Sequence, residues 1–131
     1  MTYLTKTQIL AVDDIQYQDV DVPEWGGTVR VKALTGTERD SLEQSMIEGR
    51  GKAREMNLAN FRAKLAAHSI VDEKGKRIFN DLDVFDLGRK SGAALARVFN
   101  VASRLSGFTD DDIEELTKNS ESGQSGDSGT N

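Results

Sequence analysis

The sequence contains no cysteine, a single histidine and few aromatic residues. Without cysteine the chain has neither disulfides nor thiolate zinc sites. One histidine, His68, leaves little for a metal site or a catalytic triad. Aromatic residues make up 6% of the chain and charged residues 30%, which is typical of a soluble protein with a modest core.

Long apolar runs are also missing. No stretch approaches the roughly 18 apolar residues of a membrane-spanning helix, and the N-terminus lacks the regions of a signal peptide. These absences predict a cytoplasmic protein without a membrane partner. A nucleic-acid partner is not predicted either, because the net charge is −5 and the basic residues are not interleaved with aromatic ones.

No catalytic motif is present. Residues 49–54 are rich in glycine and basic residues but lack the Gly-Lys-Ser/Thr ending of a phosphate loop. Residues 72–76 lack the alternating oxygen ligands and terminal glutamate of a calcium loop. The sequence therefore predicts no enzymatic activity, no cofactor and no metal, and favours a protein that works by contact.

Charge is divided unevenly along the chain. Residues 1–49 carry four basic and nine acidic side chains, residues 50–104 carry twelve and six, and residues 105–131 carry one and seven. Two interpretations stay open. The charges are scattered over a solvated surface, or the basic middle faces an acidic partner or the chain's own acidic end.

The clearest local pattern is a β-hairpin that leads into a helix. Residues 15–22 and 28–32 alternate in the period-two pattern of half-buried strands, and residues 23–27 (PEWGG) reverse the chain. Trp25 lies beside this turn. We expect its ring to fold back over the sheet, with an exposed contact anchor as the alternative.

Helices are predicted along most of the remaining chain. Thr35 and Glu38 have capping-box spacing at the start of a helix over residues 36–48, with Gly49 as its stop. Residues 49–54 are predicted to be a flexible basic connection, with a mobile contact loop as the alternative. Near the N-terminus, Thr5 caps a short helix, although a strand is a competing prediction. Further helices are expected over residues 56–69, 82–87 (capped by Asn80 or Asp81), 91–106 and 109–116.

Between these helices the sequence predicts one more turn and a cationic histidine. Residues 70–79 have apolar pairs flanking Asp-Glu-Lys-Gly, which favours a tight hairpin of two short strands. His68 lies near the C-terminal end of the helix over residues 56–69. We expect the helix dipole to favour its charged form there, and we assign it a structural role.

The predicted fold class is α+β, with an N-terminal β-hairpin packed on a mainly helical domain. Residues 1–118 form the single domain. Residues 119–131 are rich in serine and glycine and contain nothing to bury, so they are predicted to be a disordered acidic tail.

Five segments of the sequence resemble tail assembly chaperones of long-tailed, siphovirus-type bacteriophages. They are residues 4–14 (LTKTQILAVDD), 22–31 (VPEWGGTVRV), 34–40 (LTGTERD), 58–65 (LANFRAKL) and 97–107 (RVFNVASRLSG). The resemblance extends over residues 4–118 and includes no catalytic motif.

The resemblance implies a non-enzymatic helper in the host bacterial cytoplasm that is absent from the mature virion. Such a chaperone binds the tape measure protein and keeps it soluble while tail tube subunits polymerise around it. A longer frameshifted product recruits the tail tube protein in such families, and this chain would be the short form. A structural virion component, such as a head-tail connector or minor tail protein, is the alternative.

The resemblance assigns no contact residues. We therefore predict the binding surface from the chemistry of the side chains alone. Large apolar side chains and the basic loop are the candidates, because a shielding partner must offer apolar surface that can be displaced. Self-association into rings or spirals would suit a long partner. The predicted partner-binding residues are Trp25, Arg50, Lys52, Arg54, Phe108, Ile113 and Leu116.

Overall fold

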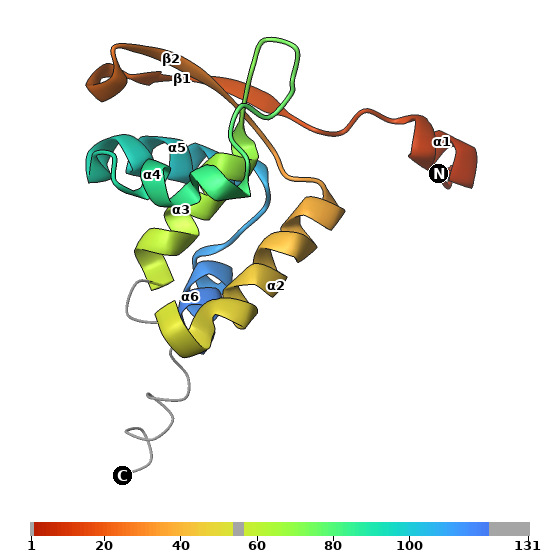
Figure 1. Ribbon diagram of the computed structural model, residues 1–131. Coiled ribbons are helices and arrows are strands. Elements are labelled where there is room, and N and C mark those ends of the chain that lie inside the picture. Colours follow the sequence, from red (N-terminus) through yellow and green to blue (C-terminus); the bar gives the residue numbers. More distant parts are fainter. Residues whose placement is uncertain (1, 54–56, 121–131) are drawn as a thin grey trace.

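The computed structural model describes residues 2–53 and 57–120, and within them the side chains of residues 2–46 and 60–117. Figure 1 shows a small sheet at one side of a group of helices, with a short helix projecting from the body. The elements are α1 (Lys6–Ala11), β1 (Tyr17–Val22), η1 (Pro23–Trp25), β2 (Gly27–Lys32), α2 (Gly36–Ala53), α3 (Asn57–Ser69), β3 (Ile70–Val71), η3 (Asp81–Asp83), α4 (Val84–Gly88), α5 (Gly92–Leu105) and α6 (Asp110–Ser120).

The predicted hairpin is confirmed. Strands β1 and β2 pair antiparallel with Val20 opposite Val29, and one turn of 3₁₀ helix reverses the chain. Gly26 follows with φ of 75°, the left-handed conformation that glycine adopts without steric cost. Strand β3 adds to the free edge of β2, which gives an antiparallel sheet in the order β1-β2-β3.

The tight turn predicted within residues 70–79 is also present, directly after β3. Gly75 has φ of 85°, and the Asp72 carboxylate accepts hydrogen bonds from the backbone amides of Lys74 and Lys76. The two arms of this turn are joined at one isolated β-bridge, between Val71 and Arg77, where the Asp72 amide donates to the Lys76 carbonyl at 2.8 Å and the Ile78 amide to the Ile70 carbonyl at 3.4 Å. As a regular strand, β3 therefore pairs with β2, which is far away in the sequence, and not with the segment that follows it directly.

The core lies between the sheet and the helices α3 and α5 (Figure 1). Phe61 of α3 is fully buried at its centre, with edge-to-face contacts to Phe99 at 5.7 Å and to Phe108 at 5.9 Å between ring centroids. Edge-to-face contacts place the positive edge of one ring on the negative face of another. Helices α3 and α5 thus supply the centre of the core.

Three helices begin with the same reciprocal cap. The Thr35 hydroxyl accepts from the Glu38 amide at 3.1 Å, and Glu38 Oε1 accepts from the Thr35 amide at 2.8 Å. Thr5 with Gln8 and Thr109 with Asp112 repeat the arrangement at α1 and α6. Each cap satisfies two backbone amides that have no partner within the helix. Residues 6–11 therefore form the predicted helix capped by Thr5, and not the competing strand.

Helix α2 does not stop at Gly49. It continues to Ala53, so the prediction of a helix end at Gly49 and of a loop over residues 49–53 is wrong. Glycine inside a helix costs only about 1 kcal/mol relative to alanine. The good helix formers around it, among them Glu48, Arg50 and Ala53, offset that cost.

The other end of the chain agrees with prediction in part. Gly107 ends the segment after α5 with φ of 80°, as expected of a helix stop. Helix α6 extends to Ser120, so Asn119 and Ser120, predicted to begin the tail, are helical. The rest of the predicted tail, residues 121–131, lies outside the described residues.

His68 does not have the predicted charge preference. Its side chain is only 14% exposed, and its Nε2 lies 3.9 Å from an Asp81 carboxylate oxygen. Burial, and then the positive charge of Arg77, lower the pKa of His68 below the usual 6.5, and the carboxylate of Asp81 offsets them only partly. Desolvation of the charged form outweighs the helix dipole here.

This lowered pKa predicts a loss of stability in mild acid. The unfolded chain binds a proton near pH 6.5 while the folded chain resists it, so the free energy of unfolding falls as pH drops below about 6.5. The slope from one proton is at most about 1.4 kcal/mol per pH unit. Urea unfolding of wild type and His68→Gln between about pH 7.5 and about pH 5 measures it. Parallel pH profiles of the two proteins would contradict the assignment.

Candidate interaction surfaces

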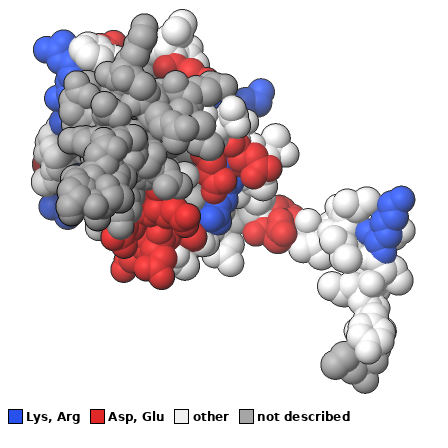
Figure 2. Space-filling view, turned by 90° about the horizontal axis from the view of Figure 1, so that it is seen from below, with Lys and Arg blue, Asp and Glu red and all other residues white. Residues whose placement is uncertain are grey.

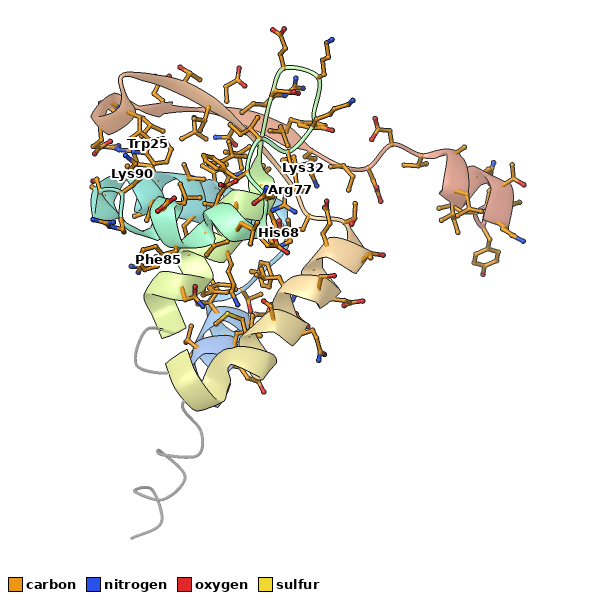
Figure 3. The ribbon with its side chains drawn as sticks, in the orientation of Figure 1. Trp25, Lys32, His68, Arg77, Phe85 and Lys90 are labelled. Carbon is orange, nitrogen blue, oxygen red and sulfur yellow. The ribbon has the colours of Figure 1, made fainter. Side chains whose placement is uncertain are left out.

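A groove opens between the hairpin turn and helix α4. Its volume is about 600 Å³, and its walls combine apolar with acidic side chains. The lining residues are Glu24, Trp25, Phe79, Asp83, Asp86, Leu87 and Lys90. Figure 3 shows Trp25 on the hairpin side of this groove, next to Lys90.

Long-range contacts hold the two walls of the groove in place. Glu24 in the turn binds the Arg97 guanidinium of α5 through both carboxylate oxygens, at 3.0 to 3.3 Å. The hydrogen bonds from Arg97 and from the Glu24 backbone amide lower the pKa of the Glu24 carboxyl. Trp25 is half-buried and packs against the core, so its ring forms a fixed wall of the groove.

The opposite side of the η3–α4 segment exposes apolar side chains. Leu82 is 89% exposed and Phe85 68% exposed. They are three residues apart, the spacing that places side chains on one helical face. Figure 3 shows Phe85 pointing away from the groove side of α4. Among the large hydrophobic side chains that the structure describes beyond residue 12, these two are the most exposed.

Helix α6 packs on α2 and α3, away from the groove. Arg39 of α2 joins the two helices, because its guanidinium lies 4.1 Å from the Phe108 ring centroid and 3.3 Å from an Asp112 carboxylate oxygen. The Thr109 amide and hydroxyl, and then Arg39, lower the pKa of Asp112. The acidic first turn of α6 therefore serves its own cap and its attachment to α2.

The structure separates the residues predicted to bind a partner. Trp25 lines the groove, whereas Ile113 and Leu116 are half-buried on α6 and pack against the core. Phe108 is only 7% exposed and belongs to the core. Arg54 and the side chains of Arg50 and Lys52 lie outside the described residues. Among the positions whose side chains the structure describes, Trp25 therefore lies apart from the residues of α6.

Sequence reasoning missed the exposed side chains of the N-terminal segment and of α4. The sequence predicted a short helix or a strand near the N-terminus and a capped helix over residues 82–87, and neither prediction included an exposed apolar surface. The signal was present in both segments, since each carries large apolar residues without a complete helical stripe to bury them.

Within the described parts of the chain, no cluster of His, Asp and Glu side chains has the arrangement of a metal site. None of the described helices is both long and apolar enough to span a membrane.

Comparison with known proteins assigns the chain to a family. No curated protein and no solved structure matches it. The profile of a family described as phage tail assembly chaperone matches residues 6–119, which include every described helix and strand apart from the last residue of α6. The match covers well over half of the chain and agrees with the resemblance of the five sequence segments. The protein thus belongs to the phage tail assembly chaperone family.

Proposed function

We propose that this chaperone binds the tape measure protein of its phage and keeps it soluble during tail tube assembly. The proposal depends mainly on one observation, the match to the chaperone family over residues 6–119. A tape measure protein is a very long helical chain with apolar stripes, so it aggregates unless a partner covers those stripes. The action proposed is binding alone, without catalysis, in the host cytoplasm.

The exposed pair Leu82 and Phe85 is our proposed contact for the tape measure protein. An amphipathic helix presents apolar residues at three- and four-residue spacing, and this pair offers matching apolar anchors. Arg89, whose guanidinium lies 5.9 Å from the Phe85 ring centroid, borders the pair with positive charge. Such a small patch binds weakly at each copy, which lets polymerising tube subunits displace it.

Co-expression with the phage's own tape measure protein tests this function. We expect the full chain to keep the tape measure protein soluble and to co-purify with it. The double variant Leu82→Asp with Phe85→Asp should lower its recovery at least about tenfold, since charges replace both anchors. The readout is the amount of tape measure protein in the soluble, co-purified fraction.

Ala93→Asp is the matched control. It introduces the same side chain at an exposed position in the first turn of α5, where negative charge is favourable, and should behave like wild type. A tape measure protein that is equally soluble without the chaperone would contradict the function. Full recovery with the double variant would contradict only the assigned surface.

The proposal also covers the later stages of assembly. A chaperone that leaves when the tube closes is absent from finished particles, whereas a head-tail connector or minor tail protein is present in fixed copies. Quantitative mass spectrometry of purified virions distinguishes the two. The same measurement on infected cells would detect a longer frameshifted product that recruits the tail tube protein.

A further inference from the structure

The groove beside Trp25 combines apolar walls with carboxylates. The rings of Trp25 and Phe79 and the side chain of Leu87 are its apolar walls, and Asp83 and Asp86 lie on its α4 side. The two aspartates are three residues apart, the spacing that places side chains on one helical face. A volume of about 600 Å³ is within the range of pockets that hold ligands, and it has room for several side chains of a partner.

The carboxylates of the groove differ in the partners that they already have. Glu24 binds the Arg97 guanidinium through both oxygens, so its charge is balanced. One oxygen of Asp83 accepts from the Asn80 amide at 2.8 Å and completes the cap of η3. The Asp86 side chain is exposed, and within the described residues it forms neither a hydrogen bond nor an ion pair. Asp86 is therefore the carboxylate that is available to a partner.

The chemistry of this groove favours a positively charged partner. Aromatic rings attract cations through their negative faces, and carboxylates attract them directly. The apolar stem of a lysine or arginine can lie along the ring of Trp25 while its charge reaches Asp86. Lys90 is the cation of the lining, and against Asp83 and Asp86 it leaves a net negative charge. An acidic partner would be repelled by both carboxylates.

The groove and the exposed pair Leu82 and Phe85 lie on two sides of the η3–α4 segment. Figure 3 shows Phe85 pointing away from the groove side of α4, so one straight helix does not contact both surfaces. Their charges also differ, because Arg89 borders the exposed pair and Asp86 borders the groove. The two surfaces therefore favour segments of opposite charge.

We propose that the Trp25 groove binds a basic amphipathic helical segment of the tape measure protein, separate from the segment on Leu82 and Phe85. This inference rests on the proposed function. Apolar side chains of the bound helix fill the space between Trp25 and Leu87, and a lysine or arginine pairs with Asp86. Each contact is weak, but binding of one segment raises the local concentration of the next segment of the same long chain. The chaperone thus holds the chain firmly while each contact is displaced separately.

Peptide binding to the full chain tests the groove. The probe is a synthetic helical peptide of about 20 residues, long enough to form a helix, with a leucine stripe flanked by lysines and no aromatic residue. A second peptide has glutamate in place of each lysine. Trp25 is the single tryptophan of the sequence, so its fluorescence reports on the groove, and calorimetry gives the affinity. We expect the lysine peptide to change Trp25 emission saturably and the glutamate peptide to bind at least about tenfold more weakly.

Asp86→Arg reverses the charge at the groove wall. We expect it to weaken binding of the lysine peptide at least about tenfold and to bind the glutamate peptide more tightly than wild type does. Its position is exposed, so the variant should retain the wild-type thermal unfolding transition.

Asp14→Arg is the matched control for Asp86→Arg. It makes the same change of charge at an exposed position before β1, in the N-terminal stretch that Figure 2 shows leading away from the body. It should bind both peptides like wild type. The double variant Leu82→Asp with Phe85→Asp should also bind the lysine peptide like wild type, because these side chains lie on the other side of α4.

Three results with the peptides would overturn the proposal. They are a lysine peptide that does not bind, equal binding of the two peptides, and an affinity for the lysine peptide that Asp86→Arg leaves unchanged. Loss of lysine-peptide binding in the double variant would also overturn it and assign the peptide to the exposed pair. These tests require no tape measure protein, so their failure is distinct from a failure of the proposed function.

Co-expression with the tape measure protein then tests the identity of the bound segment. Asp86→Arg should lower the amount of soluble, co-purified tape measure protein, and Asp14→Arg should not. Recovery that is equal for wild type and Asp86→Arg would overturn the assignment of this groove to the tape measure protein. A tape measure protein that is soluble without any chaperone would contradict the proposed function and this assignment together, while the peptide results would still stand.

Discussion

Phe61→Ala is expected to lower the free energy of unfolding by about 3 to 5 kcal/mol. The ring is fully buried and meets Phe99 and Phe108 edge to face, so its removal leaves a cavity that three elements border. Stabilities of such domains are about 5 to 15 kcal/mol, and this single change therefore removes a large part of the total. Urea unfolding followed by far-ultraviolet circular dichroism measures the loss.

Phe85→Ala is the matched control for Phe61→Ala. It deletes the same side chain from a position that is 68% exposed, and we expect a change within about 0.5 kcal/mol. Phe61→Leu should fall between the two, since it retains part of the buried volume. Equal losses from the two alanine variants would show that Phe61 is not at the centre of the core.

Glu38→Gln is expected to cost about 2 to 3 kcal/mol, because it leaves Lys32 buried without its counter-charge. The Lys32 side chain is 9% exposed; its Nζ is paired with the Glu38 carboxylate and donates to the Ala33 carbonyl at 3.0 Å. Figure 3 shows Lys32 in the interior, close to Arg77 and His68. Glutamine can still accept from the Thr35 amide, so this substitution retains the helix cap and removes the charge. Urea unfolding at neutral pH measures the cost.

The pH dependence of the free energy of unfolding provides a second test of the Lys32–Glu38 pair. Burial by itself raises the pKa of Glu38, but hydrogen bonds from Lys32 and Thr35 outweigh it and hold the pKa below its usual 4.5. Because the folded carboxyl resists protonation, its contribution is present above about pH 4.5 and is lost as pH falls through the folded pKa. The Glu38→Gln variant has no carboxyl at this position, so it should not show this loss of stability in acid.

Two further variants separate the ion pair from general damage. Lys32→Met combined with Glu38→Gln should recover most of the stability, since neither charge is then buried. Glu43→Gln removes a partner of Arg39 at the surface and should change stability by less than about 1 kcal/mol. A double variant no more stable than Glu38→Gln would contradict a buried, unpaired lysine as the cause.

The two variants probe different kinds of stabilisation. Phe61 contributes apolar burial at the meeting point of α3, α5 and the segment before α6. Glu38 instead joins the end of β2 to the start of α2 by charge and hydrogen bonds. Loss of the first should weaken the whole domain, whereas loss of the second should act where the sheet meets the helices.

The sequence by itself determined the features that short-range chemistry controls. The Thr35 and Glu38 cap, the left-handed Gly26 and the apolar stripe of α5 each involve residues close together in the chain. Caps and turns depend on neighbouring backbone amides, and a helical stripe depends on a fixed angle per residue. Such features can be recognised before any fold is known.

Only the tertiary structure decided where distant elements meet. Gly107 turns the chain so that Phe108, a predicted partner-binding residue, packs on Phe61 in the core. The pairing of β3 with β2 and the burial of Lys32 likewise depend on contacts between distant segments or on the packing around them. The exposure of α1 and the groove beside Trp25 likewise depend on how distant elements pack. A local pattern reports which side chains are apolar, but only packing decides whether a partner element within the chain covers them.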